Sequence, residues 1–163
     1  MYLVDANVLI EAHRTYYAPD LAPVFWEWMA EQAEKGTIAS VSQVREELED
    51  GDRQDFLRSW SRSLPADFWR EPLVEAAPSY QTIFDWINEA ARPYIPAAVS
   101  GFFEVADSSL VAQAHARGHE IVTFEKPSPQ ARKRVLIPDV CDALGVSYCD
   151  GFTMYRQLGL RFS

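Results

Sequence analysis

The sequence predicts an α/β fold in which helices cover both faces of a central parallel sheet. Short apolar runs alternate along the chain with longer stretches of helical periodicity. The 163 residues include 48% hydrophobic side chains, enough to bury one substantial core. Because no internal repeat and no low-complexity segment interrupts this alternation, we expect a single domain spanning residues 1–163.

The first predicted strand is short and buried. Residues 2–4 (YLV) are apolar, and helical periodicity begins directly after Asp5. A charged side chain in so apolar a run is costly to bury unless its charge is compensated. Asp5 is therefore the first candidate for a functional residue.

A helix, a second strand and another helix are predicted next. Residues 21–36 form a helix that ends at Gly36, a residue type common just beyond a helix C-terminus. The run TIASVS (37–42) is the second strand. Ser42 suits an N-cap, and Gly51 would close the helix that follows it.

The middle of the chain, about residues 53–103, is predicted to consist of helical pieces and is rich in tryptophan. Ile83, Trp86, Ile87 and Ala90 would share one helix face. Breaks are expected at the prolines, namely Pro65, Pro72, Pro78, Pro93 and Pro96. Aromatic residues are enriched in binding hot spots, so this region is a candidate interface. Core packing is nevertheless the expected role for most of its tryptophans.

The last part of the chain returns to regular alternation. Residues 106–120 are predicted to be a helix, 120–125 (EIVTFE) a strand, and 133–146 another short strand and helix. Cys141 and Cys149 match neither a zinc pattern nor a disulfide framework. We expect both to be thiols in a reducing compartment.

Charge and hydropathy restrict the partners. The net charge is −9, whereas a protein that binds phosphate non-specifically is normally basic. Any contact with nucleic acid must therefore come from a local basic patch, with metal ions screening nearby carboxylates. Neither a signal peptide nor an apolar run of about 18 residues is present, so we expect a cytoplasmic protein without membrane contact.

Three acidic residues occupy equivalent places in the predicted pattern. Asp5 ends the first strand, Asp107 begins a helix, and Glu125 ends the strand 120–125. In an open parallel sheet, ligands bind in the crevice outside the carboxyl ends of the strands. If their strands are neighbours, these side chains should face one crevice.

Glu47 is predicted to join them from a helix. It shares a helix face with Val44 and Leu48, whereas Glu46 lies off that face. A carboxylate that borders a buried face can reach over the end of the sheet.

Each acid also has an ordinary explanation. Asp5 and Asp107 could cap helices, because Asp is a favoured N-cap. Glu47 could be solvated, and Glu125 could start a polar loop before Pro127. As a set, however, four acids in one crevice would repel one another without a cation. Such clusters hold Mg²⁺ or Mn²⁺, which prefer oxygen ligands.

The ordered motifs resemble those of PIN-domain nucleases. Residues 3–12 (LVDANVLIEA) are similar to the opening motif, Asp–any–Asn–any–hydrophobic. Residues 40–48 (SVSQVREEL) resemble the second acidic motif, and 106–125 (ADSSLVAQAHARGHEIVTFE) resemble the third and fourth. The run 137–146 (IPDVCDALGV) and the tryptophan-rich middle look like a bacterial branch of PIN-like proteins.

The resemblance implies a three-layer PIN-like α/β/α fold and a set of site residues. The metal-binding and catalytic acids would be Asp5, Glu47, Asp107 and Glu125, supported by Asn7 and Thr123. Glu125 departs from the pattern, because most members have Asp there, so it would contact the metal directly or through water. Asp139 is either a further acid or the N-cap of the helix after it.

The resemblance also implies an activity: endoribonuclease hydrolysis of RNA phosphodiester bonds that depends on Mg²⁺ or Mn²⁺. Candidate residues for holding the substrate are Arg14, Lys126, Arg132, Lys133 and Arg134. Many small bacterial PIN proteins are toxins of toxin–antitoxin pairs and form homodimers restrained by a small partner protein.

Two other functions compete with this one. A degenerate PIN module would bind RNA or protein without cutting, and Glu125 is the feature that favours it. A phosphatase of the haloacid dehalogenase type would need a second Asp two residues after Asp5, where this chain has Asn7. That difference argues against the phosphatase.

Overall fold

The computed structural model describes residues 1–50, 55–89 and 92–162. Within these residues, five parallel strands form one sheet in the order β3-β2-β1-β4-β5. The strands are β1 (Tyr2–Val4), β2 (Ile38–Val41), β3 (Trp69–Arg70), β4 (Glu120–Val122) and β5 (Tyr148–Cys149). The predicted α/β class with a parallel sheet is confirmed.

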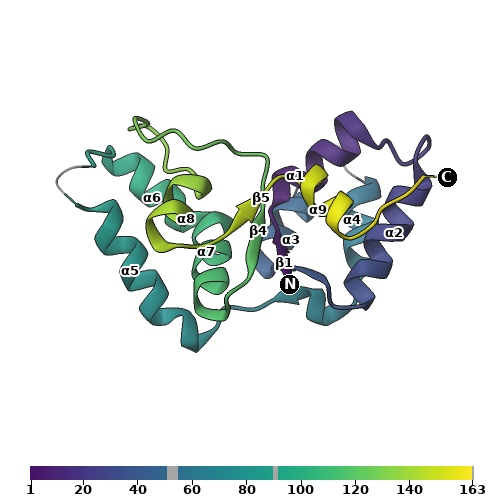
Figure 1. Ribbon diagram of the computed structural model, residues 1–163, viewed down its shortest axis with the longest axis horizontal. Coiled ribbons are helices and arrows are strands. Elements are labelled where there is room, and N and C mark those ends of the chain that lie inside the picture. Colours follow the sequence, from purple (N-terminus) through teal and green to yellow (C-terminus); the bar gives the residue numbers. More distant parts are fainter. Residues whose placement is uncertain (51–54, 90–91, 163) are drawn as a thin grey trace.

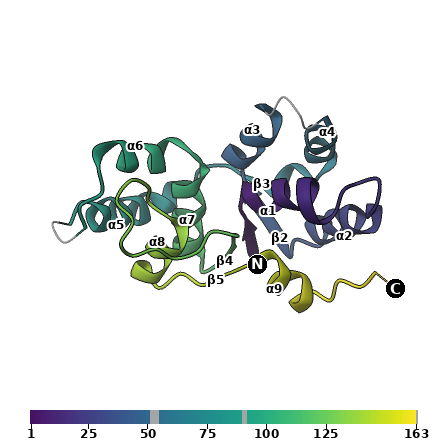
Figure 2. The ribbon, with the colours of Figure 1, turned by 90° about the horizontal axis from the view of Figure 1, so that it is seen from above.

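Helices pack on both faces of the sheet, in two groups that Figure 1 shows on either side of the strands. One group contains α1 (Ala6–Glu11), the π-helix η1 (Ala12–Tyr16), α2 (Pro23–Glu34), α4 (Asp55–Ser63) and α9 (Gly151–Gln157). The other contains α5 (Ala77–Ile87), α6 (Pro96–Glu104), α7 (Ala106–Arg117) and α8 (Ile137–Leu144). Seen from above, the groups remain on opposite sides of the strands (Figure 2).

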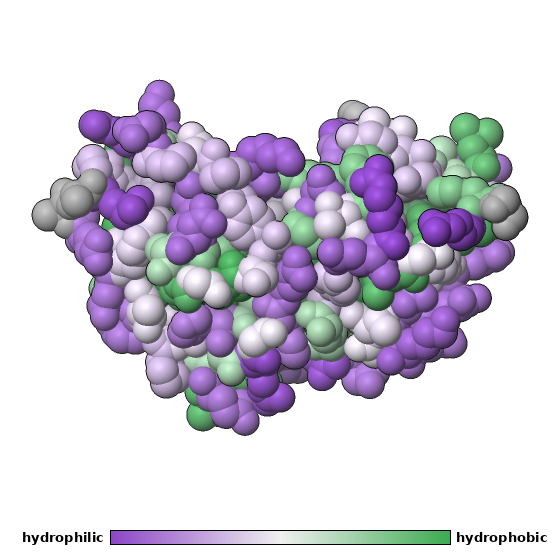
Figure 3. Space-filling view, viewed as in Figure 1, coloured by the Kyte–Doolittle hydropathy of each residue, from purple (hydrophilic) through white to green (hydrophobic). Residues whose placement is uncertain are grey.

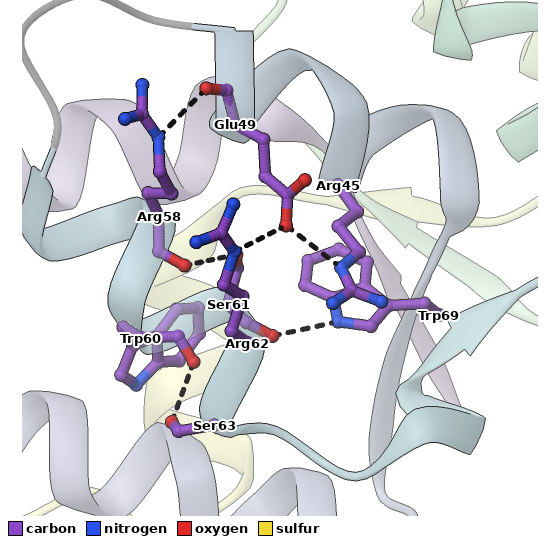
Figure 4. A network of polar contacts seen from close by, with 8 residues as sticks. All are labelled: Arg45, Glu49, Arg58, Trp60, Ser61, Arg62, Ser63 and Trp69. Carbon is purple, nitrogen blue, oxygen red and sulfur yellow. Dashed lines mark hydrogen bonds and ion pairs between the residues drawn. The ribbon is translucent and has the colours of Figure 1, made fainter.

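Between the groups lies α3 (Ser42–Asp50), which contacts α1, α4 and α7. It includes Ser42, so the predicted N-cap is the first helical residue, and the predicted Gly51 lies outside the described residues. Glu49 ties α3 to α4: Arg45 Nε and Arg62 Nε each donate to Glu49 Oε1 at 3.3 Å (Figure 4). These contacts hold the helix that carries Glu47.

The middle of the chain differs from prediction at two prolines. Pro78 and Pro96 lie in the first turns of α5 and α6, where a missing N–H costs nothing, so they start helices instead of breaking them. Two short 3₁₀ helices, η2 (Ala66–Phe68) and η3 (Val74–Ala76), complete the segment together with β3, which was not predicted.

The tryptophans serve mainly in packing. Trp26, Trp60 and Trp69 are buried, while Trp28 and Trp86 are half-buried against the core. On the predicted stripe of α5, Ile83 and Ile87 are buried as expected, and Ala90 lies outside the described residues. Core packing is therefore the main role of this region in the folded chain.

One predicted strand is wrong. Residues 133–136 form no strand, although Val135 is buried, and α8 already begins at Ile137 because Pro138 favours the first turn of a helix. The fifth strand is instead β5, in which Tyr148 pairs with Ile121. Cys141 and Cys149 are free thiols, as predicted. No helix of the described residues combines the length and apolarity needed to cross a membrane.

Candidate functional site

The carboxyl ends of the strands face a hollow between the two helix groups, visible at the upper edge of the space-filling view (Figure 3). Asp5 follows β1 directly, at this end of the sheet, and is only 4% exposed. Its backbone N–H donates to the carbonyl oxygen of Val122 at 3.0 Å. Asp5 is thus held between the central strands β1 and β4.

A hydrogen-bond network orients the Asp5 carboxylate. The hydroxyl of Thr123 donates to Asp5 Oδ2 at 2.9 Å. The same hydroxyl oxygen accepts from Asn7 Nδ2 at 3.2 Å and from the backbone N–H of Glu125 at 3.1 Å. Because both lone pairs of the oxygen are engaged, its proton is directed at Asp5.

Asn7 completes the network. Its Oδ1 accepts from the backbone N–H of Phe124 at 3.1 Å, so one amide side chain fixes both the Thr123 hydroxyl and the next residue of the chain. The structure therefore brings Asn7 and Thr123 to Asp5. Their supporting role remains a prediction.

The capping explanation fails for Asp5. Asp5 is the N-cap residue of α1, but its side chain makes no capping hydrogen bond. Asp107 is the second residue of α7, after the N-cap residue Val105. Both carboxyl groups are consequently placed by the fold for reasons other than an N-cap bond.

Burial and mutual repulsion raise pKa values among the predicted acids. Burial, then the charges of Asp107 and Glu125, raise the pKa of Asp5 to about 8. Burial, then the charge of Glu125, raise the pKa of Asp107 to about 7. Partial burial also raises the pKa of Glu47, whose Oε1 accepts from the backbone N–H of Ala106 at 3.3 Å. The four predicted acids thus share one electrostatic environment.

Glu125 is engaged by the protein. Its Oε2 accepts from the backbone N–H of Ile137 at 2.8 Å, and its Oε1 forms an ion pair with Arg134. The prediction that Glu125 ends a strand is wrong, because β4 already ends at Val122. The longer side chain spans from the acid crevice to the first residue of α8.

Asp139 lies apart from the crevice. Both of its oxygens accept from the backbone N–H of Ser128, at 3.0 and 3.1 Å. The prediction that it is an N-cap is wrong, because α8 begins at Ile137 and Asp139 falls within its first turn. Its carboxylate holds the loop after β4.

The basic candidates are divided among different places. Lys133 and Arg134 line a cavity of about 240 Å³ together with Asp107. Lys126 lines another cavity beside Asn7 and Glu125. Arg14 is paired with Glu11, and Arg132 lines a separate cavity near Arg92. Of the five basic candidates, Lys126, Lys133 and Arg134 share a cavity with a predicted acid.

The donor set suits a hard cation, but it is not a closed cage. Among the described residues, no three His, Cys, Asp or Glu side chains are arranged to hold a metal ion together. Mg²⁺ is commonly bound through one or two carboxylates while it keeps several waters. Asp5 and Asp107, both carboxylates with raised pKa values at the crevice, fit that form of binding.

Comparison with known proteins places the chain in a family. Residues 2–162 match the family model described as Domain of unknown function (DUF4411). The chain belongs to this family. Among curated proteins, none matches it significantly.

The fold also resembles a solved structure. A chain of VapBC2 from Rickettsia felis, crystallised bound to a DNA fragment from the promoter, aligns with a TM-score of 0.54 at 13% identity. The alignment covers 91% of this chain and 97% of that one. At such low identity the likeness concerns the fold alone, and it supports the PIN-like α/β fold predicted from the motifs.

Sequence reasoning missed the aromatic residues beside the acids. Tyr16, Phe124 and Phe152 line the cavity that also contains Asn7 and Glu125. Phe124 lies within the fourth motif, directly before Glu125, and this position could have indicated that it is near the acids. Phe152 comes from α9, whose position depends on the pairing of β5 with β4.

Proposed function

We propose that this protein is a metal-dependent endoribonuclease that hydrolyses RNA phosphodiester bonds. The observation that carries the proposal is the convergence of Asp5, Asp107 and Glu47 on the carboxyl edge of a parallel sheet, with Asp5 oriented by Thr123. Such an edge is where open α/β sheets bind ligands. The order of the acidic motifs, which resembles that of PIN nucleases, supports the same activity.

Asp5 and Asp107 would hold Mg²⁺ or Mn²⁺ directly, while Glu47 and Glu125 would reach the hydrated ion through water. Thr123 donates a hydrogen bond to Asp5 Oδ2, whereas no described residue donates one to Asp5 Oδ1. When bound, the ion would polarise the scissile phosphate, activate a water molecule and stabilise the charge on the leaving oxygen. Glu47 would be the proton acceptor for the attacking water.

Lys133 and Arg134 would position the phosphate. They line a cavity together with Asp107, so a phosphate near the acids lies within reach of two positive charges. Arg134 also pairs with Glu125, which leaves its guanidinium held at the crevice. The local positive charge opposes the repulsion that a chain of net charge −9 exerts on RNA.

The proposal is tested by cleavage of defined oligoribonucleotides with purified protein. We expect cleavage with Mg²⁺ or Mn²⁺, none in excess chelator, and a loss of about 100-fold or more in Asp107→Asn. Asp85→Asn, on the exposed face of α5, is the matched control and should cleave normally. Full activity after verified metal removal would refute the mechanism.

A non-cleaving PIN-like module is the second candidate, favoured by one observation. Both oxygens of Glu125 already accept from protein groups, so the fourth acid is engaged in structure. A module of this kind would bind RNA or protein without metal-dependent turnover. Binding without cleavage, unchanged in Asp107→Asn, would select it.

We further propose a toxin role, with a small antitoxin protein as partner and a homodimer as the toxin's own assembly in the cytoplasm. The support is the resemblance of the motifs to small PIN toxins, together with the fold shared with a chain of VapBC2. Expression of the protein alone should arrest growth, and Asp107→Asn should not. Light scattering measures the oligomeric state directly.

A further inference from the structure

A cavity of about 480 Å³ opens beside the acid crevice. Its lining includes Asn7 and Glu125, which also belong to the acid network. The rings of Tyr16, Phe124 and Phe152 line it as well, together with Lys126 and the acidic residues Glu11 and Asp150. A ligand held by the acids could thus extend directly into an aromatic cavity.

The three rings contact one another and leave one of them open to solvent. Tyr16 meets Phe152 edge-on with ring centroids 5.0 Å apart, and Phe124 lies 5.8 Å from Tyr16 and 5.5 Å from Phe152. Phe124 and Phe152 are half-buried, whereas Tyr16 is 48% exposed. Nearly half of the surface of Tyr16 is therefore accessible to a ligand in this cavity.

The rings are held by separate elements. Tyr16 is the last residue of the π-helix η1, a rare element that often occurs at functional sites. Phe152 lies in the first turn of α9, next to Gly151. A methyl group at position 151 would lie 2.9 Å from Phe124 Cζ, so the glycine allows α9 to approach this ring closely.

The aromatic cavity is joined to the acids by Asn7. Its Oδ1 accepts from the Phe124 backbone N–H, and its Nδ2 donates to the Thr123 hydroxyl that orients Asp5. The ring of Phe124 and the carboxylate of Asp5 are therefore held in one network. A phosphate at Asp5 would place a neighbouring base near the rings.

We propose that this cavity is a subsite for one unpaired base of a single-stranded RNA, stacked on Tyr16 beside Phe152. The inference rests on the proposed nuclease function and names its substrate class. Stacking on aromatic side chains requires a base that is splayed out, so a continuous duplex would not enter. Recognition would tolerate different bases, because every base has a flat π-face.

Binding measurements test the subsite without relying on turnover. Affinity for labelled single-stranded RNA is measured in an Asp5→Asn background with Mg²⁺. Tyr16→Leu should weaken binding about tenfold, the usual effect of losing one base–aromatic stack, while Tyr16→Phe should bind normally. Phe84→Leu is the matched control, because Phe84 is 50% exposed on α5 in the opposite helix group.

An abasic scan locates the stacked base. Each oligonucleotide carries one abasic residue, at a different position in each. At one position, the unchanged protein and Tyr16→Leu should bind the RNA with equal affinity, because the base that would stack on Tyr16 is missing. Phe152→Leu should give the same pattern and guards against a local effect of a single variant. If Tyr16→Leu and the unchanged protein bind every RNA with equal affinity, the subsite proposal is overturned.

The outcomes separate the subsite from the nuclease proposal. Metal-dependent cleavage of RNA that is indifferent to Tyr16→Leu and Phe152→Leu overturns the subsite and leaves the nuclease intact. Tyr16-dependent binding of single strands without any cleavage supports the subsite and refutes the nuclease. Equal binding of single-stranded and fully duplex RNA also overturns the subsite.

Discussion

Asp5 carries an unfavourable electrostatic load in the metal-free protein. Its pKa of about 8 lies well above that of an unfolded Asp, about 3.9. The folded state therefore binds a proton that the unfolded chain has lost, and stability falls as pH rises from about 4 to about 8. Above that window the full penalty of the ionised, buried carboxylate remains.

Removing the charge should relieve this load. In chelator at pH 8, we expect Asp5→Asn to be more stable than the unchanged protein by about 1–3 kcal/mol, equivalent to about one to two pKa units at about 1.4 kcal/mol each. The gain is smaller than the whole pKa shift implies, because the polar amide of Asn would still be buried. The gain should shrink at pH 5, where Asp5 is protonated in the folded state. Thermal melts at the two pH values measure it.

The same melts test Asp5 as a metal ligand. Mg²⁺ should stabilise the unchanged protein by binding preferentially to the folded state, and should stabilise Asp5→Asn much less. Asp85→Asn serves as the control and should respond to Mg²⁺ like the unchanged protein. An equal response in Asp5→Asn would argue against coordination by Asp5.

Glu125 shows how side-chain length matters at one residue. Arg134 is 66% exposed, so its ion pair contributes little, and the bond from Ile137 N–H carries more of the stabilisation. Glu125→Asp withdraws the carboxylate by about 1.5 Å and should cost about 1–2 kcal/mol. Glu125→Gln keeps the reach and should cost less.

Urea unfolding and amide exchange at Ile137 measure the difference between the two variants. In Glu125→Asp we expect faster exchange at this amide, because the start of α8 loses its acceptor. If Glu125→Asp protects Ile137 as well as the unchanged protein does, the longer side chain is not what holds α8.

At the scale of one helix, α3 presents two adjacent acids with different surroundings. Both side chains are exposed, but Glu47 accepts from Ala106 N–H, one residue before Asp107, whereas Glu46 lies off the face of α3 that contacts α7. We expect Glu47→Gln to reduce RNA cleavage about tenfold or more, since it removes a candidate proton acceptor. Glu46→Gln should have little effect. Initial cleavage rates of both variants decide the assignment, and the reverse order would contradict it.

The predictable parts of the fold are those with local signals. Residues 2–4 became β1 and residues 21–36 contain α2, with Gly36 at a positive φ of 70° beyond its end. The strand β5 was missed because two residues carry no pattern, and pairing with β4 defines them. Val135 and Leu136 have the apolar character of a strand, but residues 133–136 form none, and Val135 is buried by packing alone.

The same contrast applies to the site. The position of Asp5 at a strand end and of Glu47 on a helix face followed from periodicity and spacing. The partners of Glu125 lie nine and twelve residues away in a segment without periodicity, so no local pattern indicates them. The aromatic cavity depends on α9 returning to the sheet, which is a property of the whole fold.

Over the whole molecule, charge opposes RNA while a few cations are placed to bind it. The net charge is −9, and the basic residues beside the crevice are Lys126, Lys133 and Arg134. Lys126 and Lys133 form no ion pair with any described residue. RNA binding should therefore depend on a small number of phosphate contacts.

This small number predicts an unusual salt dependence. If about three phosphates are neutralised, the logarithm of the binding constant for single-stranded RNA should fall with the logarithm of salt at a slope of about −2. Lys133→Gln should bring the slope closer to zero by about 0.7, the share of one phosphate contact. Lys35 lies just beyond the end of α2 and is paired with Glu31, so Lys35→Gln should leave the slope unchanged. Affinity titrations between low and physiological salt in the Asp5→Asn background measure the slopes. A slope of about −5 or steeper would mean that RNA follows a basic surface other than the one beside the acids, because three cations cannot release that many counterions.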